Sequence, residues 1–257
     1  MNKRQNFPGR SILFAVVLLI VSNLSFGQRY ENNAIPKEGN IYLNPEFGND
    51  MNSGTKENPL KSLFEAARRV NQANGKGAIT INLSEGIYGL DATVTFHPAN
   101  WWFSKSDRLT IRAEFLPDDS LWNPAKMPGI ISTMPLNFKP YGNQDPFKGA
   151  SYGIQIETSH VTIQGLRVLG TPVHEKPAEG FVRRNYPIVR EGRNLDDLRI
   201  TQCLFVGDKH AIPNHLAILA SGHGVVVDHC VFFVLKMLLC IGFLTALLNV
   251  VRCIIIS

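Results

Sequence analysis

Three similar segments in the second half of the chain constrain the fold more than any other feature. They read VTIQGLRV, LRITQCLF and VVVDHCVF, beginning at positions 161, 198 and 225. In each, every second residue is apolar until a two-residue bend, after which the alternation resumes. Aligned, they form three columns of like residues: Ile163, Ile200 and Val227; Leu166, Cys203 and Cys230; Val168, Phe205 and Phe232. Repeats a few tens of residues apart predict a solenoid, in which successive turns stack on one another.

Shorter alternating stretches indicate that each repeat holds three strands. GIQIETSH precedes position 161 and LAILASGHG precedes position 225. We assign these stretches to a first sheet, the segment before each bend to a second sheet and the segment after it to a third. LTIRAEF, which begins at Leu109, is a weaker member of the set. A Pro-rich insertion at 116–149 follows it and breaks the period.

The N-terminal part of the repeat region reads as strand, loop, helix and strand. IYL is followed by the turn-rich NPEFGNDMNSGT, and AITINL is an alternating strand. Between them, Asn58 is predicted to cap a helix that has Pro59 in its first position. The apolar face of this helix comprises Leu60, Leu63, Phe64, Ala67 and Val70, and the pattern stops near Asn74 and Gly75.

This order resembles the N-terminal part of secreted parallel β-helix proteins of the pectate-lyase-like superfamily. The residues that match are Gly48, Asp50, Gly54, Thr55, Pro59, Leu63, Ala66 and Ala67. The resemblance implies an all-β, right-handed parallel β-helix whose open end is covered by an amphipathic capping helix. We expect the β-helix domain to span 28–233, with the cap at 40–75 and turns of the coil from about 78.

The first 27 residues have the composition of a secretory signal peptide. Lys3, Arg4 and Arg10 precede an apolar run from Ile12 to Val21, and Ser25-Phe26-Gly27 is a small-x-small cleavage site. An uncleaved N-terminal anchor is the alternative. The formal net charge of +5 becomes close to neutral once this segment is removed, which argues against a nucleic-acid partner. We expect a secreted, periplasmic or cell-surface protein, and a monomer.

The apolar tail at 234–257 has no acidic residue, no proline and no turn cluster. Its length suits a membrane helix flanked by Lys236 and Arg252. It could instead be a further turn of the coil, although it lacks outward polar residues. The abrupt change of composition within a repeat favours a third interpretation, an out-of-frame or truncated end.

The four cysteines do not have the spacing of a zinc site. Cys203 and Cys230 share one column, and neighbouring strands are close enough for a disulfide, but their parallel Cβ directions are poor for one. We therefore expect stacked buried thiols.

Candidate functional residues are placed by the resemblance, which implies a groove along the outer face of the first sheet, walled by long turns after the third-sheet strands. Those turns are predicted at 170–194 and 207–215. Lys209, Arg184 and His210 are the catalytic candidates, and Asp208 with Glu157 is the candidate Ca²⁺ site. Substrate-binding candidates are Arg183, His174 and Gln155, and Trp101, Trp102 and Trp122 could stack on sugar rings or belong to the core.

The resemblance implies action on an extracellular, acidic polysaccharide, with a uronate lyase ahead of a glycoside hydrolase. A non-catalytic carbohydrate-binding or scaffold module, or an inactive fragment of a longer protein, remains open, as does a solvated charged loop for each candidate residue. Asp228 and His229 are adjacent in a predicted strand, so we expect their side chains on opposite faces and not paired.

Overall fold

The computed structural model describes residues 34–132, 150–169, 184–207, 214–233, 237–241, 249–251 and 254–256. Contacts divide the chain into two compact units, 1–34 and 35–257. The predicted signal peptide lies outside the described residues, and the account below concerns the second unit. No helix among these residues has the length and apolarity needed to cross a membrane.

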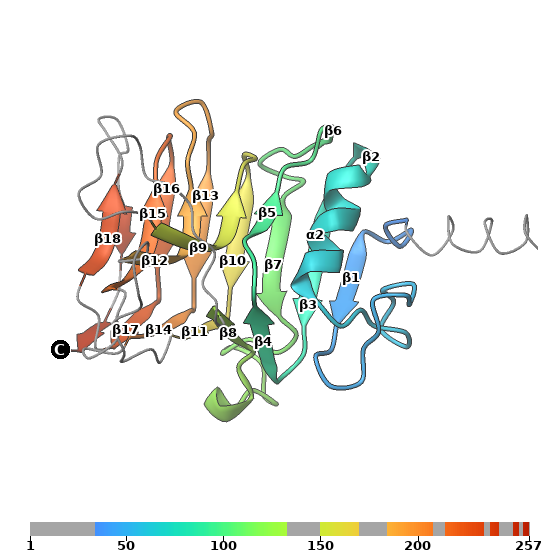
Figure 1. Cartoon of the computed structure of the whole chain (residues 1–257), viewed down its shortest axis with the longest axis horizontal. Helices are drawn as coiled ribbons and strands as arrows, with labels where there is room; N and C mark the ends of the chain where they lie inside the picture. Colours follow the sequence, from blue (N-terminus) through green and yellow to red (C-terminus); the bar gives the residue numbers. More distant parts are fainter. Residues whose placement is uncertain are drawn as a thin grey trace, which may run out of the picture. The chain divides into compact units, whose positions relative to one another are not determined.

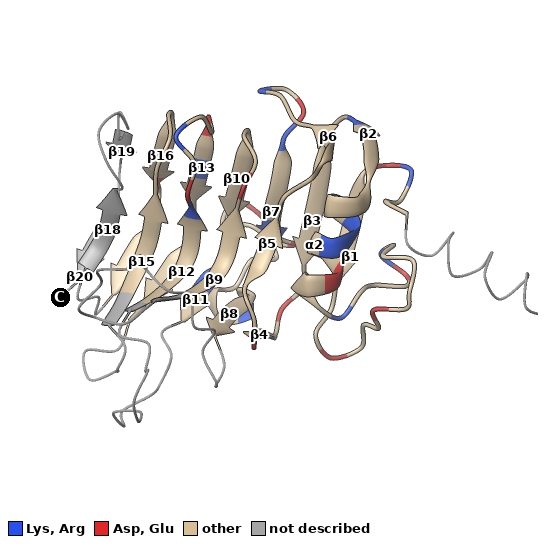
Figure 2. Ribbon diagram, turned by 45° about the horizontal axis from the view of Figure 1, so that its top comes forward, with Lys and Arg blue, Asp and Glu red and all other residues tan. Residues whose placement is uncertain are grey.

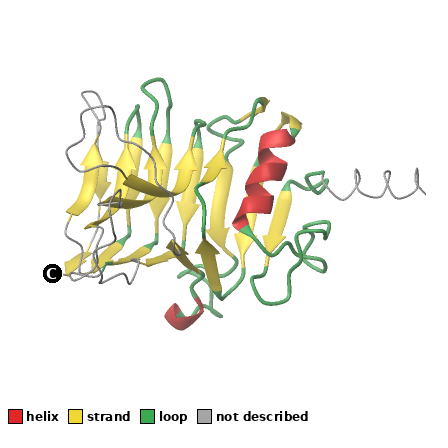
Figure 3. Ribbon diagram, in the orientation of Figure 1, coloured by secondary structure: helices red, strands yellow, loops and turns green. Residues whose placement is uncertain are grey.

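Three parallel sheets make up the second unit (Figures 1 and 3). The first sheet runs β5 (Val94–Phe96), β9 (Ala150–Ile156), β12 (Arg184–Arg190), β15 (Asn214–Ala220) and β18 (Met237–Ile241). The second runs β1 (Asn40–Leu43), β3 (Ile79–Leu83), β7 (Leu109–Ala113), β10 (Val161–Gln164), β13 (Leu198–Thr201), β16 (Val225–Asp228) and β19 (Asn249–Val251). The third runs β4 (Ile87–Leu90), β8 (Gly129–Ser132), β11 (Arg167–Leu169), β14 (Leu204–Val206), β17 (Val231–Phe233) and β20 (Ile254–Ile256).

The chain visits the first, second and third sheets in turn and then returns to the first, so it winds as a parallel β-helix. A right-handed winding is the hand that parallel strand connections take. The predicted fold class and strand order are thereby confirmed. A separate two-stranded sheet pairs β2 (Asn74–Lys76) with β6 (Asn100–Trp102).

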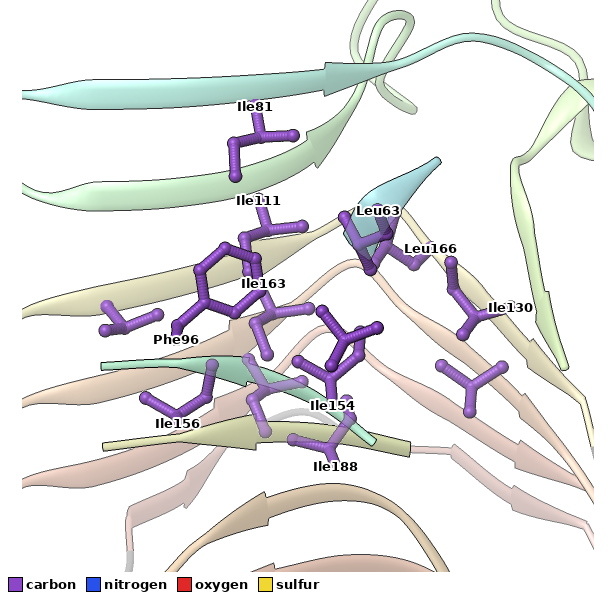
Figure 4. Close-up of a cluster of buried hydrophobic side chains, with 14 of the residues drawn as sticks. Leu63, Ile81, Phe96, Ile111, Ile130, Ile154, Ile156, Ile163, Leu166 and Ile188 are labelled. Carbon is purple, nitrogen blue, oxygen red and sulfur yellow. The ribbon is translucent and has the colours of Figure 1, made fainter. Parts of the chain in front are cut away.

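The predicted columns are confirmed by the strand register. Ile163 pairs with Ile200, and Ile200 pairs with Val227. In the third sheet Phe205 pairs with Phe232, and the two rings stack with centroids 4.8 Å apart and planes 5° from parallel. All of these side chains are buried in one core, part of which Figure 4 shows. The alternation of the sequence therefore directs one side of every strand into the coil.

The bend between the second and third sheets depends on one residue with a positive φ. Gly165, Gln202 and His229 occupy equivalent positions, with φ of 73°, 54° and 52°. This backbone turn places His229 Nδ1 3.4 Å from Asp228 Oδ1. Our expectation that these two side chains point apart was wrong, because His229 lies in the bend and does not continue the strand.

Cys203 and Cys230 are buried free thiols, as predicted. The hydrogen bond between the two thiols and their burial raise the pKa of Cys230. A thiol held in its neutral form is a poor nucleophile and metal ligand, so this pair contributes to packing.

Two parts of the winding differ from the sequence prediction. LTIRAEF is a full member, because Leu109 pairs with Val161 and Ile111 with Ile163. The supposed insertion contains β8 and a short 3-10 helix, η1 (Pro124–Lys126). Strand β8 fills the third-sheet position between β4 and β11. Residues 133–149 lie outside the described residues.

The capping helix is α2 (Leu63–Gln72), which begins later than predicted. Leu60 forms a β-bridge with Leu43, so the chain is still extended where we expected the first helical turn. The N-cap is Ser62, whose hydroxyl accepts a hydrogen bond from the Glu65 amide at 3.1 Å. Asp50 in turn accepts from the amides of Lys61 and Ser62 at 2.9 and 2.8 Å, which fixes the start of the helix.

The described residues of the C-terminal tail pair as a further turn of the coil. Strand β18 pairs with β15, β19 with β16 and β20 with β17, all in parallel. This is the interpretation that the sequence analysis disfavoured because the tail lacks outward polar residues. The backbone can continue each sheet regardless, because ladder hydrogen bonds do not depend on the side chains.

Candidate functional site

Most of the predicted site residues lie outside the described residues: Lys209, His210, Asp208, Arg183 and His174. Arg184 is the first residue of β12, and its backbone pairs with Ala150 and Asn214. The connection at 170–183 joins β11 to β12, and the one at 208–213 joins β14 to β15. Both therefore lead from the third sheet to the first, as the resemblance implied. The predicted turns at 170–194 and 207–215 were too long, because Arg184–Arg190 pair with β9 as strand β12, and β15 already begins at Asn214.

Glu157 and Gln155 are brought together at the end of β9. Gln155 Nε2 donates to Glu157 Oε1 at 2.5 Å, and Glu157 Oε2 lies 3.0 Å from His97 Nδ1. His97 follows β5, and its amide donates to Asn71 Oδ1 at 2.6 Å, which ties this cluster to α2. His97 is mostly exposed, whereas Gln155 is buried. We call His97, Gln155 and Glu157 the β9-end cluster. At its centre is the solvent-accessible carboxylate of Glu157, whose two oxygens contact Gln155 and His97.

Sequence reasoning missed His97 because β5 is only three residues long. Phe96 pairs with Ile156, so the residues that follow, His97 and Glu157, lie side by side. Recognising VTF as a first-sheet strand would have predicted this contact.

The β9-end cluster supplies one carboxylate for the candidate Ca²⁺ site, and that carboxylate already has two partners. Ca²⁺ takes six to eight oxygen ligands, most often from several carboxylates. Within the described ranges, no group of three or more His, Cys, Asp or Glu side chains is placed to hold a metal ion. A calcium site therefore depends on Asp208 and other residues outside those ranges.

Further along the first sheet, the outer face is apolar. Ile188 belongs to the core, so Val189, the next residue of an extended strand, points outward. It is fully buried within a second cluster that comprises Tyr152, Tyr186, Val189, Leu216 and Leu219. The Tyr152 and Tyr186 rings pack edge to face with centroids 5.9 Å apart. A ligand on this face would reach the β9-end cluster, but it could not reach the buried Val189.

Between the first and second sheets, successive turns are joined by an ionic cluster. Asp197 accepts a hydrogen bond from Arg108 Nη1 at 2.5 Å and lies 3.0 Å from His160 Nδ1. Arg108 also donates to Thr162 Oγ1 at 2.8 Å. Burial alone would raise the pKa of Asp197, but the hydrogen bonds from Arg108 and His160 hold it below its ordinary value. This carboxylate is therefore ionised and links three consecutive turns.

The three tryptophans differ in accessibility. Trp101 packs against the core and its Nε1 donates to Gly77 O at 2.8 Å. Trp102 is 72% exposed, and Trp122 has a buried Nε1 for which the described residues supply no partner. Of the three, Trp102 is the one with a face available for stacking on a sugar ring.

Charged residues of both signs are interspersed along the described chain (Figure 2).

The fold and the β9-end cluster define an all-β parallel solenoid with a small polar site at the capped end of its first sheet.

No protein-family model matches the chain, and no curated protein sequence matches it. Two solved structures are similar to it at 15% identity. A rhamnogalacturonan lyase matches with a TM-score of 0.43 over 83% of this chain and 56% of its own. The GH136 lacto-N-biosidase from Eubacterium ramulus matches with a TM-score of 0.34 over 76% of this chain and 34% of its own. This chain thus spans about half the length of the first of these proteins and about a third of the second.

Proposed function

We propose that this protein acts on an extracellular acidic polysaccharide, with the polymer meeting the first sheet at its capped end, beside the β9-end cluster. The observation that carries the proposal is the winding order. The two segments at 170–183 and 208–213, which contain His174, Arg183, Asp208, Lys209 and His210, each run directly into a first-sheet strand, β12 or β15. That is the arrangement which the resemblance to pectate-lyase-like proteins requires.

The proposed chemistry is β-elimination on a uronate polymer. Lys209 or Arg184 takes the proton beside the sugar carboxylate, and the electrons of that C–H bond form a C=C bond. The glycosidic C–O bond breaks, and the departing oxygen takes a proton, for which His210 is the candidate donor. Ca²⁺ held by Asp208 and Glu157 would neutralise the carboxylate when bound, and Arg183, His174 and Gln155 would bind neighbouring sugars.

The test is incubation of the purified full chain with polygalacturonate, with and without Ca²⁺. We expect growth of ultraviolet absorbance from the unsaturated product, and its loss in Lys209→Ala or Arg184→Ala. Lys105→Ala, which removes an exposed lysine from the turn between β6 and β7, is the matched control and should keep full activity. Product formation that survives both candidate-base substitutions would overturn the assignment of these residues.

A second candidate function is non-catalytic binding of the same polymer. It is favoured by the β9-end cluster, in which both oxygens of Glu157 already have partners. Retention of the full chain on immobilised polygalacturonate without product would support the binder. If the full chain neither forms product nor is retained on the polymer, both candidate functions are excluded.

A further inference from the structure

A cavity of about 280 Å³ lies on the third-sheet side of the coil, near the capped end. Its walls come from the loop after β1, the turn between β3 and β4, helix η1 and strand β11. The lining residues are Asn44, Glu46, Phe47, Glu85, Gly86, Ile87, Ala125 and Arg167. We call this the β4–β11 pocket. It is slightly smaller than the roughly 300–1,000 Å³ of drug-sized sites, which suits one small polar ligand.

Arg167 is the cationic side chain among the lining residues. In the sheet it pairs with Gly129 on one side and Leu204 on the other. Its Nε is buried, and the described residues supply no hydrogen-bond partner for it. A buried polar nitrogen without a partner is energetically unfavourable, and more so when the group is charged. An anionic ligand would supply the missing partner.

Gly129, which has no side chain, lets Ile87 pack close to the strand beside this arginine. A Cβ at Gly129 would lie 2.6 Å from Ile87 Cδ1 and 3.6 Å from Arg167 Nη2. Any larger side chain here would therefore push into Ile87 and toward the guanidinium. Gly129 also donates its amide to Gly86 O at 2.8 Å, which holds the two strands together at the pocket.

The rim of the pocket is polar, exposed and fixed in place. Glu46 and Glu85 are exposed carboxylates, and Lys126 lies 3.7 Å from Glu85. Asn44 Oδ1 accepts from the amides of Glu46 and Phe47 at 3.0 and 2.9 Å, so the loop that carries them is a capped turn. Phe47 is 82% exposed, and Ile87 is 51% exposed. The rim thus combines carboxylates that can accept hydrogen bonds from sugar hydroxyls with apolar side chains.

We propose that the β4–β11 pocket binds one acidic sugar unit. The sugar carboxylate pairs with the Arg167 guanidinium, which has a fork geometry that matches carboxylates. Glu46 and Glu85 accept hydrogen bonds from the ring hydroxyls, and Phe47 and Ile87 contact the C–H face of the ring. This inference rests on the proposed action on acidic glycans and adds a binding site on a different sheet from the proposed substrate face.

The experiment measures binding of monomeric galacturonate and of neutral galactose to the full chain by calorimetry. We expect galacturonate to bind and galactose to bind at least tenfold more weakly, because galactose lacks the carboxylate. Arg167→Leu should weaken galacturonate binding at least tenfold, and Arg167→Lys should weaken it less. The matched control is Arg112→Leu on the outer face of β7, where Arg112 bonds the Ala113 carbonyl, and it should bind as the wild type does.

Folding is monitored in parallel, because Arg167→Leu should not lower the melting temperature: it removes a buried Nε that has no hydrogen-bond partner among the described residues and places an apolar side chain beside Ile87 and Leu204. Unchanged galacturonate binding in Arg167→Leu, or equal binding of galactose, would overturn the inference. Polygalacturonate turnover or retention by Arg167→Leu is measured separately. If the wild type neither cleaves nor retains polygalacturonate but binds galacturonate through Arg167, the proposed function is wrong and the pocket assignment holds. If it cleaves or retains the polymer but does not bind galacturonate through Arg167, only the pocket assignment is wrong.

Discussion

Buried arginines in this chain chiefly bind backbone carbonyl groups. Arg69 donates to the carbonyls of Ser53 and Asn52 at 2.8 and 2.6 Å. Arg190 does the same at Ser221, at 2.8 Å, and its burial lowers its pKa to about 10. Both therefore fasten a turn to an adjacent helix or strand. Arg167 differs, since the structure as described shows no such side-chain bond for it, and this difference is the reason to assign it a ligand.

Removing the Arg69 guanidinium should destabilise the cap. Arg69→Met leaves the Ser53 and Asn52 carbonyls without their side-chain donor and removes one of the two arginines that bind Glu65, and breaking a buried pair typically costs about 3–5 kcal/mol. The matched control is Arg68→Met, because Arg68 binds the same Glu65 from an exposed position and should cost about 1 kcal/mol or less. Denaturant unfolding measures both. Equal losses for the two variants would contradict a special role for Arg69.

Acid should weaken the fold partly through Asp197. The folded-state pKa of this carboxyl lies below its unfolded value, so it contributes stability above the ordinary Asp pKa of about 3.9. That contribution is lost as the pH falls through the folded pKa, where the proton displaces the bonds from Arg108 and His160. Asp197→Asn should therefore be less stable than the wild type at neutral pH.

The same variant should also lose less stability on acidification, since it has no carboxyl left to protonate at this position. Unfolding free energies measured from neutral pH downward check both statements. The exposed Asp107, which bonds only Ser104 and Ser106 among the described contacts, provides the control substitution, Asp107→Asn. If the unfolding free energy of Asp197→Asn falls as steeply with decreasing pH as that of the wild type, Asp197 does not contribute to the acid sensitivity.

At the scale of elements, neighbouring residues of one strand should differ sharply in their contribution. In β17, Phe232 is 2% exposed and stacks on Phe205, whereas Phe233 is 41% exposed on the outer face. Phe232→Ala should cost about 3–5 kcal/mol through lost burial and the cavity left behind. Phe233→Ala should cost about 1 kcal/mol or less. Denaturant unfolding compares the pair, and a reversed order would mean that the strand faces the other way.

The strands that could be predicted from sequence are those in which alternation and a bend occur together. Ile163, Ile200 and Val227 are followed by such a bend, so both their register and their burial follow from the pattern. Strands β5 and β8 have no bend signal and few residues, and β8 is surrounded by prolines. Their position is set by pairing with neighbouring turns of the coil, which no local pattern reports.

The same distinction explains the cap and the candidate site. The amphipathic face of α2 was predictable, but its start depends on Leu60 bridging Leu43, a contact between distant segments. Gln155 and Glu157 could be placed near the first sheet from alternation. The neighbouring His97 could not, because its position requires the register of β5 against β9.

At the scale of the whole molecule, the last turn of the coil needs a covering segment, because each of its three strands has one edge that no further strand pairs with. Strands β18, β19 and β20 pair with β15, β16 and β17, so removing residues 234–257 would expose those edges. Exposed edges pair with other chains and lower stability. A chain ending at Phe233 should therefore melt at a lower temperature than the full chain and self-associate at lower concentration.

Differential scanning calorimetry and light scattering test this prediction. Hydrogen exchange adds a local readout, because the amides of β15 should lose protection while those of β3, on the capped side, keep theirs. Solenoid turns contact mainly their neighbours, so the loss should fade with distance from the cut. Uniform protection and unchanged melting in the shortened chain would show that residues 234–257 add no turn to the coil, and the interpretation of an out-of-frame or anchoring tail would then replace that of a continuing one.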